Sequence, residues 1–168
     1  MGDPVFQLSE VVILNWRSLA FNLLKKLIAR KFPTVQSITC EELVQWLENP
    51  EQIQPILLDA RSEAEYQVSH LQQARRIDPN CPNLTGLVEV SPQMPIVVYC
   101  SVGYRSARVA TRLLQAGYSH VYNLEGSIFQ WVNEGRPVFQ DDRPTVVVHP
   151  YNWVWGTLLK WQNRGQAG

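Results

Sequence analysis

Short apolar runs alternate with segments of helical spacing from Val35 to Pro137, and this alternation constrains the fold more than any other feature of the chain. The runs expected to be strands are residues 35–38, 55–60, 75–78, 95–99 and 120–124. Helices are expected over residues 39–47, from 62 onward, near Leu87, over 108–116 and over 127–134. Repeated strand–helix units predict an α/β fold with a parallel sheet of about five strands and helices on both faces.

Two of these helices have a sequence signal at their start. Thr39 is followed three residues later by Glu42, and Ser62 is followed by Glu65 at the same distance. Such pairs satisfy the free N–H groups of a first helical turn. We therefore expect Glu65 to be a capping residue. Cys40, which lies inside the first pair, is expected to be structural.

One strand-to-helix connection, residues 100–106 with the sequence CSVGYRS, carries groups suited to chemistry. It follows the apolar run 95–99 directly and opens the next helical pattern. Backbone N–H groups and the positive end of that helix would face Cys100, and Gly103 lets the backbone turn these groups inward. Arg105 adds a fixed positive charge. These conditions lower the pKa of a thiol and hold an anion beside it, so Cys100 is a candidate nucleophile in preference to an ordinary core residue.

Composition and charge exclude several other functions. The formal net charge of the 168 residues is zero, which argues against a general nucleic-acid binder. The three cysteines, Cys40, Cys81 and Cys100, are odd in number and irregularly spaced, so we expect no disulfide framework. No cysteine or histidine cluster has the spacing of metal ligands, and we expect no metal or cofactor. A reducing, cytoplasmic location is the natural prediction.

Residues 9–31 are expected to form one amphipathic helix that ends before Pro33. Its apolar face comprises Val12, Trp16, Leu19, Leu23 and Leu27, widened by Ile13, Ala20, Leu24 and Ile28. Polar residues interrupt the apolar stretch before it reaches membrane-spanning length. We expect the helix to pack against the domain. Peripheral contact with a membrane surface through residues 9–31 is the less favoured alternative.

The C-terminal residues fall outside the strand–helix alternation. Trp153, Trp155 and Trp161 lie within nine positions, with Leu158 and Leu159 between them. We expect this Trp-rich tail to clamp onto the N-terminal helix and extend the core. An exposed patch for a partner or a bilayer is the alternative.

The segment from about Val35 to Val138 resembles a single-domain rhodanese, a member of the rhodanese-like sulfurtransferase family. The elements that carry the resemblance are 57–61 (LLDAR), Glu65-Tyr66, 69–71 (SHL) with Ala74, the loop 100–106, and 124–126 (LEG) with Trp131 and Pro137. Two positions depart from the usual pattern: Ser69 and Glu125 stand where glycines are common. The resemblance implies a three-layer sandwich over residues 35–138. It does not cover the expected N-terminal helical extension, 1–34, or the C-terminal extension, 139–168.

The resemblance also implies a double displacement that needs no cofactor. Cys100 would take sulfane sulfur from a small donor anion such as thiosulfate, become a persulfide, and pass the sulfur to cyanide, a thiol or a protein cysteine. The residues expected to bind anionic sulfur form the loop Ser101, Val102, Gly103, Tyr104, Arg105 and Ser106. Val102 and Tyr104 are expected to shape the pocket mouth. Ser106 is expected to hydrogen-bond the thiolate or to cap the helix.

Other polar residues are given supporting roles. Asp59 and Arg61 are expected to form a structural ion pair or brace rather than to act in catalysis. His70 is expected to be a structural histidine. Cys81 lies in the loop 79–83, PNCPN, and is expected to be an inert surface thiol. Its alternative role is to resolve a persulfide as a disulfide.

Two other functions stay open at this point. Phosphatases and arsenate reductases with a related loop place five residues between cysteine and arginine, whereas the four residues Ser101 to Tyr104 intervene here. A smaller ring of N–H groups suits one sulfur atom better than a phosphate. A non-catalytic adaptor is the second alternative, and the presence of both Cys100 and Arg105 argues against it.

Overall fold

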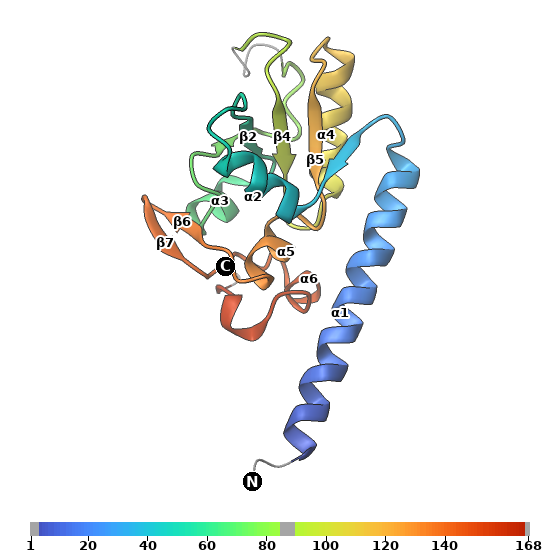
Figure 1. Ribbon diagram of the computed structural model, residues 1–168, viewed down its shortest axis with the longest axis vertical. Helices are drawn as coiled ribbons and strands as arrows, with labels where there is room; N and C mark the ends of the chain where they lie inside the picture. Colours follow the sequence, from blue (N-terminus) through green and yellow to red (C-terminus); the bar gives the residue numbers. More distant parts are fainter. Residues whose placement is uncertain (1–3, 85–89, 167–168) are drawn as a thin grey trace.

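The computed structural model describes residues 4–84 and 90–166, and a parallel sheet forms its centre (Figure 1). The described strands of this sheet are β1 (Gln36–Ile38), β2 (Ile56–Asp59), β3 (Arg75–Arg76), β4 (Ile96–Tyr99) and β5 (Val121–Leu124). Their spatial order is β1-β5-β4-β2-β3, and all neighbours run parallel. The predicted α/β fold with five parallel strands is confirmed. The helical segment expected near Leu87 falls outside the described residues.

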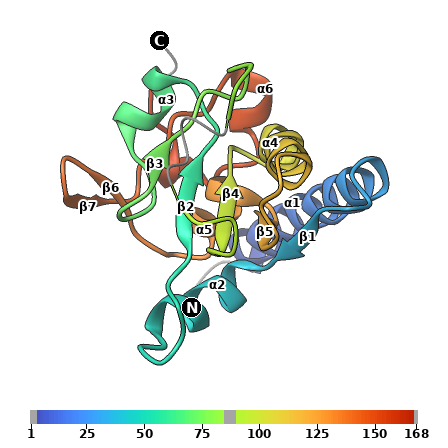
Figure 2. The same ribbon diagram turned by 90° about the horizontal axis from the view of Figure 1, so that it is seen from above.

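Helices cover both faces of the sheet (Figure 2). The described helices are α1 (Pro4–Lys31), α2 (Cys40–Glu48), α3 (Glu63–Val68), α4 (Tyr104–Gln115), α5 (Ser127–Asn133), α6 (Trp153–Gly156) and the 3-10 helix η1 (Trp161–Asn163). On one face, Val97 of β4 shares a cluster with Leu43 of α2 and Ile128 of α5. On the other face, Val98 packs in a second cluster with Val109 of α4. Because successive side chains of a strand point to opposite faces, fully buried β4 is apolar on both.

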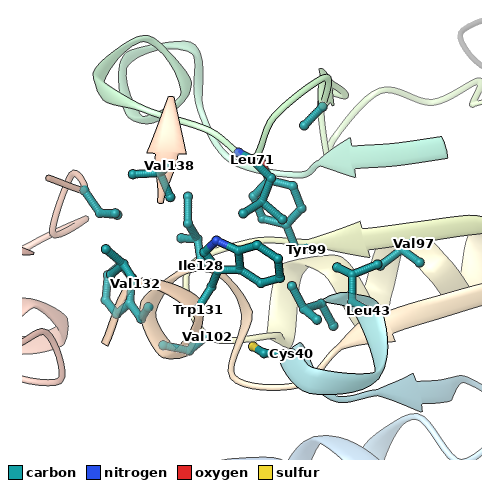
Figure 3. Close-up of a cluster of buried hydrophobic side chains, with 14 of the residues drawn as sticks. Cys40, Leu43, Leu71, Val97, Tyr99, Val102, Ile128, Trp131, Val132 and Val138 are labelled. Carbon is teal, nitrogen blue, oxygen red and sulfur yellow. Dashed lines mark hydrogen bonds between the residues drawn. The ribbon is translucent and has the colours of Figure 1, made fainter. Parts of the chain in front are cut away.

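The cluster on the α2–α5 face holds the last residue of β4, directly before the loop that contains Cys100. Figure 3 shows Leu43, Val97 and Trp131 in this cluster with Tyr99, the last residue of β4. The Tyr99 ring is fully buried, and its hydroxyl accepts a hydrogen bond from the Leu71 backbone N–H at 3.0 Å. The end of β4 is therefore fixed by packing and by a polar contact before the chain turns into the loop.

The two expected helix-start signals both form. The Thr39 N–H donates to Glu42 Oε2 at 2.8 Å, and the Ser62 N–H donates to Glu65 Oε2 at 2.9 Å. In each case the hydroxyl of the first residue accepts from the backbone N–H of the second. The capping boxes therefore start α2 and α3 where the sequence places them.

The long helix α1 packs against the domain along only one edge of its apolar face. It begins at Pro4, earlier than expected, and ends at Lys31 (Figure 1). Phe21 and Ile28 are buried, with Ala20 and Leu24 packed partly against the core. The residues of the expected central row that are left exposed are Trp16, Leu19, Leu23 and Leu27. The helix therefore packs against the domain as expected, but through Phe21 and the edge of its apolar face that carries Ala20, Leu24 and Ile28.

The C-terminal tail packs on the domain mainly through two leucines, and two of its three tryptophans are exposed. It begins with a hairpin of β6 (Val138–Gln140) and β7 (Arg143–Thr145), which was not predicted from the sequence. Leu158 and Leu159 are buried in the same cluster as Phe21 of α1. Arg17 of α1 donates to the Thr157 carbonyl at 3.2 Å. Trp155 is half-buried, whereas Trp153 and Trp161 are exposed. The clamp onto α1 forms, but these two tryptophans take no part in the core.

Of the helices in the described part of the chain, none is long and apolar enough to cross a bilayer.

Candidate active site

Cys100 lies at the carboxyl end of β4, in the short loop that leads into α4. Its Sγ accepts a hydrogen bond from the Gly103 backbone N–H at 3.2 Å and from Ser106 Oγ at 3.5 Å. The Cys100 N–H donates to Ser127 Oγ at 3.1 Å, and its carbonyl accepts from the Ile128 N–H at 3.1 Å. The start of α4 thus provides donors to the sulfur, while the start of α5 holds the backbone behind it.

Gly103 is required by the geometry of this loop. Its φ of +113° lies in the region that L side chains rarely adopt. A Cβ at this position would lie 3.4 Å from Ile28 Cδ1 of α1 and 3.5 Å from Asn123 Nδ2 of β5. The conformation directs the Gly103 N–H toward the sulfur.

The surroundings of Cys100 favour its thiolate. Burial acts to raise the pKa of this thiol, but the positive charge of Arg105 and hydrogen bonds from Ser106 and Gly103 lower it below the ordinary value of 9.0. Cys40 provides an internal contrast, because burial there raises the pKa to about 11. The predicted direction of the Cys100 shift is confirmed. The two buried thiols differ because burial outweighs the charges of Arg136 and Lys25 at Cys40, whereas Arg105 and the hydrogen bonds outweigh burial at Cys100.

Arg105 is held in place by Glu65 of α3. Arg105 Nη1 donates to Glu65 Oε2 at 2.8 Å, and Nη2 donates to Oε1 at 2.7 Å. Ser101 Oγ lies between them, 3.0 Å from Glu65 Oε1 and 2.8 Å from Arg105 Nη2. Burial acts to raise the pKa of Glu65, but its bonds to Arg105 and Ser62 lower it to about 2. Glu65 is thus a capping residue, as expected, and also the anchor of Arg105, a role that its capping-box position did not reveal.

Two further residues support the loop and were missed in the sequence. Asn123 of β5 donates through Nδ2 to the Gly103 carbonyl at 3.2 Å, and its Oδ1 lies 2.6 Å from Ser106 Oγ. Ser127 accepts from the Cys100 N–H and donates to the Leu124 carbonyl at 3.0 Å. A polar residue inside an otherwise buried strand was the available signal for Asn123, because such groups need partners.

Asp59 and Arg61 form the ion pair that the sequence led us to expect. Both side chains are fully buried, and Arg61 Nη2 lies 2.6 Å from Asp59 Oδ2. Arg61 Nε donates to Asp59 Oδ1 at 2.9 Å, and Nη2 also donates to the Ser69 carbonyl at 2.6 Å. The pair therefore joins the end of β2 to the residue after α3, as a brace.

A pocket of about 550 Å³ opens over Cys100. Val102 and Tyr104, which were expected at its mouth, line it together with Arg105. Its other walls come from two segments that were not predicted to belong to the site. The wall residues from α1 are Leu24, Leu27, Ile28, Arg30 and Lys31, and those from the tail are Tyr151 and Trp155. The Arg105 guanidinium carbon lies 4.8 Å from the centre of the Tyr151 ring.

The described residues contain no group of three or more histidine, cysteine, aspartate or glutamate side chains arranged to hold a metal ion.

Residues 39–134, more than half of the chain, match the sequence model of the rhodanese-like domain family. This protein belongs to the rhodanese-like domain family. The match contains the Cys100 loop, Glu65 and the Asp59–Arg61 brace. It excludes α1 and the C-terminal tail, so the rhodanese-like domain receives part of its pocket wall from outside the family segment.

Two relatives illustrate the range of proteins that carry this domain. A sulfurtransferase of Allochromatium vinosum is 31% identical over 104 residues, which cover 62% of this chain and 94% of that protein. The probable adenylyltransferase/sulfurtransferase MoeZ of Mycobacterium tuberculosis is 30% identical over 102 residues, 60% of this chain and 26% of MoeZ. The chain therefore spans only about a quarter of MoeZ, one of the longer relatives it matches.

A solved structure shows the same fold beyond the matched segment. The BH2092 protein from Bacillus halodurans superposes with a TM-score of 0.61 at 20% identity, over 84% of this chain and 97% of that protein. The rhodanese-like fold is thus found by sequence and by structure. Together with the two relatives named sulfurtransferases, it places the chain in a sulfurtransferase family.

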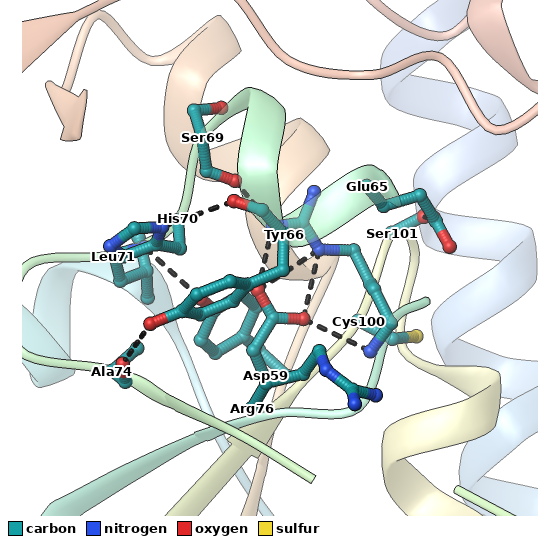
Figure 4. Close-up of polar contacts among 12 residues, drawn as sticks. Asp59, Glu65, Tyr66, Ser69, His70, Leu71, Ala74, Arg76, Cys100 and Ser101 are labelled. Atoms are coloured by element: carbon teal, nitrogen blue, oxygen red, sulfur yellow. Dashed lines mark hydrogen bonds and ion pairs between the residues drawn. The ribbon is translucent and has the colours of Figure 1, made fainter. Parts of the chain in front are cut away.

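Two candidate residues lie apart from the pocket. His70 Nδ1 lies 3.1 Å from the Tyr66 carbonyl, and its ring stacks on Tyr66 with centroids 4.0 Å apart. In the view of Figure 4, His70 and Cys100 lie on opposite sides of Asp59. Cys81 Sγ donates to the Asn83 carbonyl at 3.3 Å, and Cys81 is not part of the pocket lining. The rhodanese-like domain does not bring either residue to the opening over Cys100.

Proposed function

We propose that this protein is a sulfurtransferase that carries sulfane sulfur as a persulfide on Cys100. The observation that carries the proposal is the position of the Cys100 thiol, which accepts hydrogen bonds from Gly103 and Ser106 and lines a pocket together with Arg105. This arrangement lowers the pKa of the thiol. A thiolate is the nucleophilic form of cysteine, and a loop that stabilises it also stabilises the anionic persulfide. Membership of the rhodanese-like family supports the same chemistry.

In the first step the Cys100 thiolate attacks the outer sulfur of a donor. A bond forms between Sγ and that sulfur, and the bond from the outer sulfur to the rest of the donor breaks. The leaving group takes the electron pair; with thiosulfate it leaves as sulfite. Arg105 and the loop N–H groups face the negative charge that develops during this exchange.

In the second step a nucleophilic acceptor takes the sulfur. Cyanide or a thiolate attacks the outer sulfur of the persulfide, the S–S bond breaks, and its electron pair returns to Cys100 Sγ. The Gly103 N–H and the Ser106 hydroxyl stabilise the thiolate that is regenerated. No net oxidant or reductant is consumed, because the same sulfur atom is moved twice.

Intact-mass measurement tests the proposal directly. After treatment with thiosulfate and removal of excess donor, the protein is expected to gain about 32 Da, the mass of one sulfur atom, at Cys100. Cys100→Ser is expected to gain nothing. Cys81→Ser is the matched control and should still gain the sulfur, since Cys81 does not line the pocket.

Other outcomes would favour the alternatives. If neither thiosulfate nor an organic persulfide or thiosulfonate modifies the protein, a binding or adaptor role replaces the proposed transfer. Hydrolysis of an aryl phosphate that is lost in Cys100→Ser would instead assign a phosphatase.

A further inference from the structure

The pocket over Cys100 is larger than a small inorganic donor needs. Its volume is about 550 Å³, within the range of roughly 300–1,000 Å³ that sites for organic ligands occupy. Thiosulfate would fill roughly 150 Å³ even at about 30 Å³ per heavy atom, the volume that a water takes in the liquid. Most of the pocket would then be left to water against its walls.

The walls are apolar. Leu24, Leu27 and Ile28 of α1 form one side, and Val102 and Trp155 lie among the other lining residues. A compact dianion gains nothing from such side chains and loses hydration beside them. An apolar group gains free energy by covering them. The wall chemistry therefore matches a donor with a hydrocarbon or aromatic body.

Cationic side chains also line the pocket. Glu65 binds both terminal nitrogens of Arg105, so the cation nearest Cys100 is paired. Arg30 and Lys31, at the last turn of α1, add positive charge to the lining, and Lys31 Nζ lies 5.0 Å from the centre of the Tyr104 ring. The site combines an apolar wall with cations, which suits a donor that has an apolar body and a negatively charged sulfur group.

We propose, resting on the transfer function above, that the sulfur donor is an apolar organic sulfane-sulfur compound, a thiosulfonate or persulfide, whose body lies against Leu27 and Trp155. For a thiosulfonate, R–SO2–S⁻, the Cys100 thiolate forms a bond to the terminal sulfur, and the bond from that sulfur to the sulfonyl group breaks. The sulfinate R–SO2⁻ leaves with the electron pair. Two negative charges enter the step, and two leave it as persulfide and sulfinate.

The selectivity of sulfur loading tests this assignment. Second-order rate constants are measured by intact mass for thiosulfate, methanethiosulfonate and 4-methylbenzenethiosulfonate, each divided by the rate of the same donor with free cysteine. This division removes the intrinsic reactivity of the donor. The corrected rate for the aromatic donor is expected to exceed that for the methyl donor by about tenfold or more, with thiosulfate slowest.

A matched pair of variants on α1 locates the selectivity. Leu27 and Leu23 lie one turn apart with similar exposure, 55% and 60%, but only Leu27 lines the pocket. Leu27→Asn is expected to lower the corrected rate for the aromatic donor more than that for the methyl donor, so that the preference falls several-fold. Leu23→Asn is expected to change neither rate.

The outcomes separate the two proposals. Loading of Cys100 by all donors at the ratios seen with free cysteine overturns the apolar-donor assignment and leaves the transfer function standing. An equal loss of preference in both leucine variants also overturns it. Failure of every donor to load Cys100 overturns the transfer function itself.

Discussion

Glu65 and Arg105 form a two-point ion pair, with distances of 2.8 and 2.7 Å, that joins α3 to the start of α4. Because Glu65 also caps α3, one carboxylate fixes both the helix and the guanidinium beside Cys100. The pair fixes the position of the Arg105 guanidinium, and the Glu65 carboxylate offsets part of its positive charge. Hydrogen bonds from Ser106 and Gly103 therefore contribute, along with Arg105, to lowering the pKa of Cys100.

The first prediction concerns acid stability. The pKa of Glu65 is about 2 in the folded protein, below its ordinary value of 4.5. Its contribution to stability is therefore present above pH 4.5, decreases as the pH falls from 4.5 toward 2, and is absent below that. A shift of this size corresponds to about 3 kcal/mol. Glu65→Gln is expected to lower the free energy of unfolding in urea by about this amount at pH 7 and by little near pH 2.

A neighbouring glutamate supplies the control for this prediction. Glu63 lies in the same helix and pairs with Arg76 at the surface. Glu63→Gln is expected to change stability by no more than about 0.5 kcal/mol at either pH. Equal losses for the two variants would show that the Glu65 network contributes no more than a surface pair.

The second prediction concerns thiol reactivity. The rate of alkylation of Cys100 by iodoacetamide is expected to rise with pH through a midpoint below 9.0, because its pKa is lowered. Ser106→Ala removes one donor to the sulfur and should move this midpoint to higher pH. Cys40, with its pKa raised to about 11, should stay unmodified at neutral pH. Peptide mapping of the alkylated protein separates the three cysteines. A midpoint for Cys100 at or above 9.0 would contradict the assignment.

The third prediction compares two glycines with left-handed backbone. Gly103 and Gly117 have φ values of +113° and +97°, but a Cβ would meet other atoms within 4 Å only at Gly103. Gly117→Ala is expected to cost about 1 kcal/mol of stability and to leave sulfur loading unchanged. Gly103→Ala strains the backbone of the residue whose N–H binds Cys100, and a shift of that N–H should lower loading at least tenfold. Equal sulfur loading of both variants would show that the reaction does not depend on the backbone conformation of Gly103.

Much of the fold and the nucleophilic loop followed from local pattern. The apolar runs that became β2, β4 and β5, and the capping pairs at Thr39 and Ser62, depend on neighbouring residues along the chain. Such signals are present in the sequence because strand burial and helix capping are short-range properties. The same holds for Cys100 and Arg105, whose roles depend on one strand-to-helix turn.

The parts that were missed depend on contacts between distant segments. Glu65 reaches Arg105 across 40 positions, and Tyr151 approaches Arg105 from the tail. Neither contact can be predicted from the spacing of neighbouring residues. The apolar face of α1 was recognised from the sequence. This face is wider than the part that contacts the domain, so the sequence does not show which edge of it is buried. The pocket walls from Leu27 and Trp155 could not be assigned for the same reason.

The fourth prediction tests how α1 is held on the domain. Phe21 is 6% exposed and shares a cluster with Leu158 and Leu159 of the tail, whereas Leu19 is 69% exposed. Phe21→Ala is expected to lower the free energy of unfolding by about 3 kcal/mol, because a buried ring leaves a cavity. Leu19→Ala should change it by no more than about 0.5 kcal/mol. Urea midpoints of the two full-length variants provide the measurement, and a larger loss for Leu19→Ala would mean that the opposite edge of α1 faces the core.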